Sequence, residues 1–356
     1  MTVKRQRGWG EGGGEAMADR IGIGMVGAGS IARARHVPGF TEIPGVELVG
    51  VVNRTAESSR HAAKKLGFAS TYATWRELIE DPKVDAVVVA TWPYLHAAVT
   101  LAALDAGKHV LTQARMAMNG DEAEDMLAAS LDHPELTSMI VPAPTSIWGD
   151  RTILRLLADG ALGDLRTMRL TWGGSVSGAA ADPWRRQKRF SGHNIMAVGI
   201  LYECVARWLG DATSVQARTE VYETAERAAG RTDHLDVPDY VAIQAEFPAR
   251  VHATIEIAAH ATNGGANAAL LFGTAGTLRV DFDAKTLALA PSGSSEFAAV
   301  EIRPDERQDW RVEAEFIGAI RGEEQVHLTD FATGVRYMRF TDAVNEAAAM
   351  GQRIPL

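Results

Sequence analysis

The chain has only one cysteine, Cys204, and no long run of hydrophobic residues in its 356 positions. A single cysteine excludes an internal disulfide and any metal site made of several cysteines, and its apolar neighbours predict a buried, inert thiol. No apolar segment approaches the roughly 20 residues of a membrane-spanning helix. The segment 1–20 is basic but lacks an apolar stretch, so we expect no signal peptide and take the cytoplasm as the default location.

Positive charge is also scarce, because 36 Lys and Arg face 45 Asp and Glu and give a formal net charge of −9. This balance argues against nucleic acid or an anionic membrane as the main partner. The ten histidines show no metal-ligand spacing, and there is no Walker loop or G-x-S-x-G turn. We therefore expect a small-molecule substrate and no metal. Residues 1–19 predict a disordered tail, with Met17 as an alternative start.

What the sequence does contain is a nucleotide-binding signature near its start. Residues 21–26 predict a buried strand, and a helical pattern runs to about residue 39. Between them lies one G-x-G-x-x-A run, Gly27-Ala28-Gly29-Ser30-Ile31-Ala32. Gly27 permits the turn, Gly29 lets backbone approach a pyrophosphate, and the helix start offers N–H groups to the anion. We predict that residues 27–31 bind a dinucleotide.

The end of the second predicted strand, 46–52, bears on the choice of cofactor. Asn53 and Arg54 follow this strand, where an NAD-preferring site usually has an acidic residue for the ribose hydroxyls. Asn53 brings no charge to repel a phosphate, and Arg54 can pair with one. This favours NADP, with NAD possible. The alternative for Arg54 is an ordinary solvated arginine.

Two further predicted strands, 84–90 and 109–112, flank a helix at 96–106. Ligands bind at the carboxyl ends of strands in doubly wound parallel sheets, so Thr91, Trp92 and Gln113 are cofactor contacts, although packing explains Trp92 equally well. His96 is another candidate, with capping of its helix as the alternative. Residues 20–142 are thus predicted to form an α/β Rossmann domain.

After residue 142 the pattern changes to short alternating strands such as 165–172, 241–247 and 250–258. They predict an α+β domain over 143–356 with a mainly antiparallel sheet. The chain resembles the Gfo/Idh/MocA oxidoreductase family, and five stretches carry the resemblance: GAGSIA, ATWPYLHAAVTLAALDAGKHVL, LADGALGDLRTMRL, PWRRQKRFSGHNIMAVGILYECVARWLG and LLFGTAGTLRV. The resemblance implies a Rossmann domain, an open antiparallel sheet, a nicotinamide cofactor and a homo-oligomer formed through that sheet.

The catalytic residues that the resemblance implies are absent. The family's Glu-Lys-Pro corresponds to Gln113-Ala114-Arg115, and its Asp-x-Gly-x-His, aligned on Gly199, has Ala197 and Leu201 in place of Asp and His. A methyl group cannot take a proton from a sugar hydroxyl. A cis Ala114–Arg115 bond would cost about 3 kcal/mol, so we expect a trans path. Arg115, a permanent cation, is then expected to hold an anionic substrate together with Gln113.

A helix predicted over 193–210 offers replacements for the lost groups. His193, Ala197 and Leu201 would share one helix face. At the helix start His193 should have a lowered pKa and act as a neutral base, or it only caps the helix. Tyr202 is a second catalytic candidate, and Asn194 a substrate contact. Trp184 and Arg185, just upstream, are expected to bind a sugar-type or anionic substrate unless they belong to a solvated basic run.

Three functions stay open on these observations. The first is an NAD(P)-dependent oxidoreductase with a non-standard site, acting on a small polar, sugar-derived or anionic substrate. The second is an enzyme that keeps NAD(P) bound and uses transient oxidation with no net redox change. The third is a catalytically silent, cofactor-binding regulatory protein.

Overall fold

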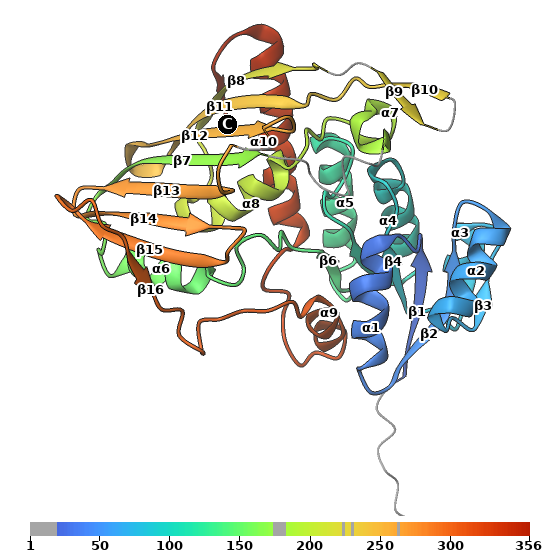
Figure 1. Ribbon diagram of the computed structural model, residues 1–356. Helices are drawn as coiled ribbons and strands as arrows, with labels where there is room; N and C mark the ends of the chain where they lie inside the picture. Colours follow the sequence, from blue (N-terminus) through green and yellow to red (C-terminus); the bar gives the residue numbers. More distant parts are fainter. Residues whose placement is uncertain (1–19, 174–182, 223–224, 229–230, 262–263) are drawn as a thin grey trace, which may run out of the picture.

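The computed structural model describes residues 20–173, 183–222, 225–228, 231–261 and 264–356 (Figure 1). The tail expected over 1–19 lies outside the described residues. None of the described helices is long and apolar enough to cross a bilayer.

The first half is the predicted parallel sheet. Its six strands pair in the order β3-β2-β1-β4-β5-β6, and every pairing is parallel. Every residue of β1 and β4 is buried, as expected for strands covered on both faces. The strands are β1 (Ile21–Val26), β2 (Val46–Val52), β3 (Ser70–Thr71), β4 (Ala86–Val89), β5 (His109–Thr112) and β6 (Ser138–Ile140). Their helices are η1 (Ala32–His36), α1 (Val37–Thr41), α2 (Ala56–Leu66), α3 (Trp75–Glu80), η2 (Pro93–Leu95), α4 (His96–Asp105) and α5 (Gly120–Asp132).

Local sequence explains several of these boundaries. Thr55 and Ser58 form a reciprocal capping box at the start of α2, and Gly67 ends that helix at a φ of 83°, where glycine adopts the left-handed conformation without a Cβ penalty. The helix after the glycine turn is unusual, because η1 is a π-helical turn. Such turns insert one residue into a helix and are frequent at functional sites.

The second half is built on a nine-stranded sheet of order β16-β15-β14-β13-β7-β12-β11-β8-β17. Only β7 and β12 pair in parallel, so the predicted mainly antiparallel domain is confirmed. Its strands are β7 (Leu165–Gly173), β8 (Ser214–Glu220), β11 (Tyr240–Phe247), β12 (Val251–Ala258), β13 (Ala268–Gly273), β14 (Gly276–Asp281), β15 (Thr286–Pro291), β16 (Ala298–Val300) and β17 (Ile354–Pro355). A separate pair is β9 (Ala225–Ala228) with β10 (Arg231–His234).

Helices cover one face of this sheet. Burial alternates along β12: Ile255 and Ile257 face the helices, whereas Thr254 and Glu256 are exposed on the opposite face. The helices of this half are α6 (Asp150–Ala158), η3 (Pro183–Arg186), α7 (Lys188–Ser191), α8 (Val198–Leu209), η4 (Pro248–Arg250), α9 (Val312–Ile320) and α10 (Phe331–Met350).

Two late helices tie the halves together (Figure 1). The long helix α10 packs against β8 and α8 of the second half and against α5 of the first. Helix α9 packs on α1, where the rings of Phe316 and Phe40 meet edge to face at 6.5 Å. The chain therefore returns to the Rossmann sheet after it has built the second one.

Candidate cofactor and substrate site

The carboxyl ends of the central parallel strands meet at one edge. In the sheet register Val26 pairs with Val52 and with Val89, and Val89 pairs with Thr112. The residues that follow these strands are therefore neighbours, and they include the glycine turn, Asn53, Thr91 and Gln113. This edge is where the sequence predicted the ligand loops.

The two glycines of the turn have different reasons to be glycine. Gly27 adopts a φ of 87°, and a Cβ on it would lie 2.7 Å from the Ala90 carbonyl oxygen. A Cβ on Gly29 would meet no protein atom closer than 3.9 Å. Gly27 is thus required by the fold itself. Gly29 leaves open space at the start of the helix, which fits the close backbone approach of a dinucleotide pyrophosphate.

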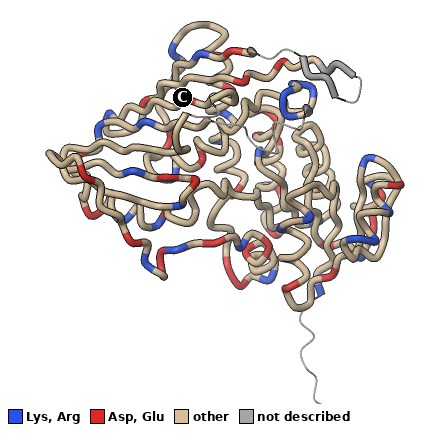
Figure 2. The backbone as a smooth tube through the Cα atoms, in the orientation of Figure 1, with Lys and Arg blue, Asp and Glu red and all other residues tan. Residues whose placement is uncertain are grey.

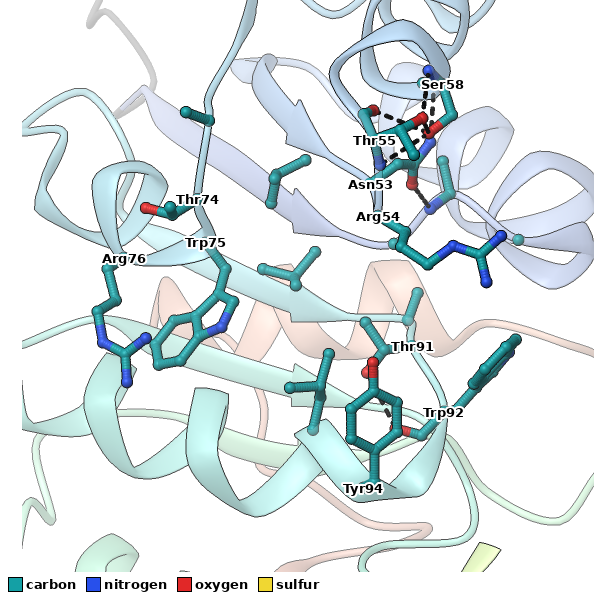
Figure 3. Close-up of a pocket in the computed structure, with 18 residues that line it drawn as sticks. Asn53, Arg54, Thr55, Ser58, Thr74, Trp75, Arg76, Thr91, Trp92 and Tyr94 are labelled. Carbon is teal, nitrogen blue, oxygen red and sulfur yellow. Dashed lines mark hydrogen bonds between the residues drawn. The ribbon is translucent and has the colours of Figure 1, made fainter. Parts of the chain in front are cut away.

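A cleft of about 590 Å³ opens beside this turn. Figure 3 shows Arg54 on one side of it and Trp75 with Arg76 on the opposite side. The predicted cofactor residues that line it are Gly27, Ala28, Gly29, Asn53, Arg54, Thr91 and Trp92. Ser30 and Ile31 lie on the exposed surface of the following helix, outside this lining.

The side chain of Asn53 forms hydrogen bonds with the glycine turn and with α2. Its Oδ1 accepts a hydrogen bond from the Ala28 N–H at 2.7 Å, and its Nδ2 donates to the Ser58 carbonyl at 3.1 Å. The side chain is therefore used to brace the turn against α2, while Arg54 stays exposed at the rim of the cleft.

The wall of the cleft opposite Arg54 was not predicted from the sequence. The Arg76 guanidinium lies 4.0 Å from the centre of the Trp75 ring, and both residues line the cleft with Thr74. An aromatic face and a cation are suitable groups for a base and a phosphate. In the sequence, the adjacent Trp75 and Arg76 after the helix-capping Thr74 are the pattern that could have predicted this wall.

His96 does not face the cleft. It is 1% exposed, and its ring nitrogens lie 3.0 Å from the Arg115 carbonyl and 3.1 Å from the Thr91 carbonyl. Burial lowers the pKa of this histidine against the opposing hydrogen bonds. The prediction of a direct cofactor contact is wrong, because the ring is used to join two loops in the interior.

Arg115 is the charged residue next to Ala114, the position at which the family usually has a lysine. It is 8% exposed. Its Nη1 donates to the Met196 carbonyl at 3.0 Å, and its buried Nε has no hydrogen-bond partner in the structure. Burial and the nearby Arg185 cation lower the pKa of Arg115 to about 10. The described residues form no salt bridge with this guanidinium, so the buried cation has no carboxylate partner among them.

The backbone of this loop differs from the expectation. The Ala114–Arg115 peptide bond is cis, so the predicted trans path is wrong. Contacts on both sides hold the segment: the Arg115 carbonyl faces His96, and the Met116 N–H donates to the Tyr337 hydroxyl at 2.6 Å.

The helix expected over 193–210 begins later. Helix α8 starts at Val198, and Met196 before it has a φ of 41°, so His193 shares no helix face with Ala197 and Leu201. Its Nδ1 lies 2.8 Å from Oδ1 of Asp342 on α10, and its side chain is 53% exposed. The hydrogen bond with Asp342 raises the pKa of His193. The prediction of a helix-start base with a lowered pKa is wrong.

Tyr202 is also removed from the crevice. It is 3% exposed, its ring stacks on Phe340 at 3.8 Å, and its hydroxyl accepts from the Ala212 N–H at 3.0 Å. Burial raises its pKa to about 12. The catalytic prediction for Tyr202 is wrong, because this side of α8 faces α10 and the core.

Asn194 has a supporting place in the turn before α8. Its buried Nδ2 donates to the Ala117 carbonyl at 2.8 Å and to the Ser191 carbonyl at 2.7 Å. Its Oδ1 is buried without a hydrogen-bond partner in the structure. Asn194 therefore holds the turn to the loop that carries Arg115, and it keeps one free acceptor.

Aromatic rings join the Rossmann loop to the second half. The rings of Trp92 and Trp184 stack at 5.3 Å with 15° between their planes, and Phe190 meets Trp92 edge to face at 4.8 Å. The Arg185 guanidinium lies 4.2 Å from the Trp184 ring centre. In Figure 2 the backbone tube at the place of α7 is largely coloured as Lys and Arg. Trp92, Trp184 and Arg185, expected separately as ligand contacts, thus form one group.

Comparison with known proteins agrees with this architecture. Residues 21–139 match the oxidoreductase family with an NAD-binding Rossmann fold, and residues 151–279 match the GFO/IDH/MocA C-terminal domain. The chain belongs to the Gfo/Idh/MocA oxidoreductase family.

Individual relatives are distant. Levoglucosan dehydrogenase of Pseudarthrobacter phenanthrenivorans is 28% identical over 184 residues, 48% of this chain and 46% of the relative. The 1,5-anhydro-D-fructose reductase of Ensifer adhaerens is 39% identical over 107 residues, 30% of this chain and 32% of the relative. The chain thus spans less than half the length of these curated relatives. A structure of levoglucosan dehydrogenase with NADH and L-sorbose superposes with a TM-score of 0.81 at 23% identity, over 94% of this chain and 98% of that one.

Proposed function

We propose that this protein is an NAD(P)(H)-dependent oxidoreductase that acts on a CH–OH group of a small, sugar-derived substrate carrying an acidic group. The cofactor supplies hydride transfer when bound. Gly27 to Gly29 and the cleft between Arg54 and Trp75 hold its dinucleotide part, and the exposed Arg54 supports a preference for NADP. The relatives named above, which act on levoglucosan and 1,5-anhydro-D-fructose by name, support the sugar-type substrate.

The buried position of Arg115 supports the proposal that the substrate carries an acidic group. A buried guanidinium without a carboxylate partner among the described residues is costly unless a ligand neutralises it. Arg185, close enough to lower its pKa, adds a second positive charge. Positions 114, 197 and 201 hold Ala, Ala and Leu, whose side chains cannot accept a proton. The proton released from the substrate hydroxyl group therefore passes to water. Arg115 binds and orients the substrate.

The test compares two sugars that differ at one carbon. D-glucuronate carries a carboxylate where D-glucose has a hydroxymethyl group, so oxidation of each is followed by NADPH absorbance with NADP⁺ present. We expect kcat/KM to favour glucuronate by at least about tenfold, as one charge-assisted contact allows. Arg115→Met should remove this preference mainly through KM. Arg151→Met, at an exposed position of α6, is the matched control. Equal use of both sugars by the wild type would contradict the acidic substrate.

The same assay separates the other functions. Product without change in NADPH would indicate transient oxidation on bound cofactor. Tight cofactor binding with no product from a panel of alcohols and carbonyl compounds would indicate a regulatory protein.

We also propose that residues 20–142 form the cofactor domain and residues 143–356 the substrate and assembly domain. The exposed face of β12, with Thr254 and Glu256, supports a homo-oligomer formed through the large sheet. Light scattering measures this directly, and a monomer at micromolar concentration would contradict it.

A further inference from the structure

A second cavity lies beside the cofactor cleft, and the function proposed above leaves it unused. Its volume is about 490 Å³, and its lining comes from the glycine turn, the π-helical turn η1, the loop after β2 and helix α2. One water needs only about 10–15 Å³ of such volume. The cavity therefore has ample space for a phosphate group.

The cavity and the cleft share a wall. Four residues line both of them: Ala28, Asn53, Thr55 and Ser58. The side chains of this wall bond within it, because Asn53 joins the turn to α2 and the Thr55 and Ser58 hydroxyls lie 2.8 Å apart (Figure 3). Dinucleotide sites of this fold hold the ribose 2′-oxygen at the end of the second strand, which here is the position of Asn53. A group attached to that oxygen would therefore lie at the shared wall.

Three residues that line the cavity but not the cleft carry nitrogen donors: Arg33, His61 and Lys65. Arg33 Nη1 donates to the Ala28 carbonyl at 2.8 Å, which holds the guanidinium beside the glycine turn. Its other N–H groups, the His61 ring and the Lys65 ammonium have no hydrogen-bond or ion-pair partner within the described part of the chain. These donors are therefore available to a ligand.

One carboxylate also lines the cavity. Glu57, His61 and Lys65 are spaced four residues apart on α2, so they project from one face of that helix. Two permanent cations, Arg33 and Lys65, thus stand against the single acidic residue that the described lining contains. A phosphate monoester carries close to two negative charges at pH 7, and the excess of positive charge favours its entry.

We propose that this second cavity binds the 2′-phosphate of NADP(H), with Arg33 and Lys65 as the cations that recognise it. The inference rests on the proposed function, because it requires that cofactor, and it extends the NADP preference beyond Arg54. Arg54 lines the cleft but not this cavity, so it acts from the cleft side of the shared wall. NADH has a hydroxyl group in place of the phosphate, and the two cations therefore act on NADPH alone.

The test measures the ratio of the Kd of NADH to the Kd of NADPH. Calorimetry at low salt gives both values, since exposed charges are least screened there. We expect a wild-type ratio of at least about ten, as charge-assisted contacts allow. Arg33→Met should lower the ratio about fivefold and Lys65→Met about twofold, the range of exposed charge pairs. The NADH affinity reports on the fold of each variant, because a misfolded variant loses both cofactors.

The same helices supply matched controls. Arg35 on η1 and Lys64 on α2 are exposed and do not line the cavity, so Arg35→Met and Lys64→Met should keep the wild-type ratio. Glu57→Gln removes the one carboxylate of the described lining and should raise the ratio about twofold. A merely structural role of Glu57 would not strengthen the binding of NADPH over that of NADH.

Inorganic phosphate separates a site for the cofactor's phosphate from an independent phosphate site. Phosphate that occupies the cavity should weaken the binding of NADPH and leave that of NADH unchanged. Equal weakening of both cofactors, or of neither, overturns the inference.

The outcomes for the inference and for the proposed function differ. An unchanged ratio in Arg33→Met and Lys65→Met, with NADPH still preferred, overturns the inference and leaves the proposed function intact. Equal wild-type affinities for NADPH and NADH overturn the inference and the NADP preference, but an oxidoreductase that uses NAD would stand. Absence of any cofactor binding overturns the proposed function, and the inference with it.

Discussion

Arg115 donates from Nη1 to the carbonyl oxygen of Met196 across 3.0 Å, so the loop after β5 is joined to the turn before α8. These are the two segments that carry Ala114 and Ala197 in place of the family's usual polar residues. A Cβ on Gly199 would lie 3.8 Å from the Arg115 side chain, so this side chain reaches the first turn of α8. In the proposed function, this cation stands where the two segments meet.

Restoring the lysine alone will not restore an ordinary sugar dehydrogenase. In Ala114→Lys the new ammonium group stands next to the buried Arg115 cation and lacks partners at 197 and 201. Groups that act as a catalytic unit are strongly non-additive. We expect no measurable oxidation of glucose or inositol above the wild-type rate, followed by NAD(P)H absorbance. A robust gain in this single variant would show that Arg115 had not replaced the lysine site.

NADPH is expected to bind more tightly than NADH, because the exposed Arg54 lies at the rim of a cleft whose described lining contains no Asp or Glu to oppose a phosphate. Arg54→Ala should remove about 1–2 kcal/mol of this preference, the value of a charge-assisted contact. Calorimetry of both cofactors measures it. Arg60→Ala, at an exposed position of the neighbouring helix α2, should leave the preference unchanged. Equal affinities in the wild type would disprove the NADP assignment.

The His193–Asp342 pair should appear in the pH dependence of stability. The pKa of His193 is raised in the folded protein, so its contribution is complete below the unfolded pKa and disappears as the pH rises through the folded pKa. His193→Gln should therefore destabilise the protein more at pH 5.5 than at pH 8.5, by less than about 1 kcal/mol because the pair is largely exposed. Thermal unfolding at both pH values measures the difference, and a larger loss at pH 8.5 would contradict the pairing.

The parts of the fold that local patterns encode could be predicted from the sequence. The alternating strands, the glycine turn and the loops after the parallel strands depend on residues close in the chain. The start of α8 could not be predicted, because Met196 takes a positive φ that methionine rarely adopts. Without that break, His193 would have continued the helix.

Long-range contacts account for the other differences. Tyr202 faces inward because Phe340 of α10 stacks on it, and helical periodicity alone cannot say which neighbour covers which face. His36 and Glu313 are 277 positions apart, and they meet only because α9 returns to the first sheet. Gln113 was predicted as a ligand contact, and its side-chain contact with His36 depends on that return.

Substitution of the two glycines of the turn should have different effects, on stability at Gly27 and on cofactor binding at Gly29. Gly27→Ala places a Cβ against the Ala90 carbonyl at a φ of 87°, and strain of this kind costs of order 1–3 kcal/mol of stability. Gly29→Ala meets open space in the protein, so its unfolding free energy should stay within about 0.5 kcal/mol of the wild type. The same methyl group would obstruct a pyrophosphate, and we expect cofactor affinity to fall at least about tenfold. Chemical denaturation and cofactor titration of both variants check the contrast. A Gly29→Ala protein that binds the cofactor normally would place the dinucleotide elsewhere.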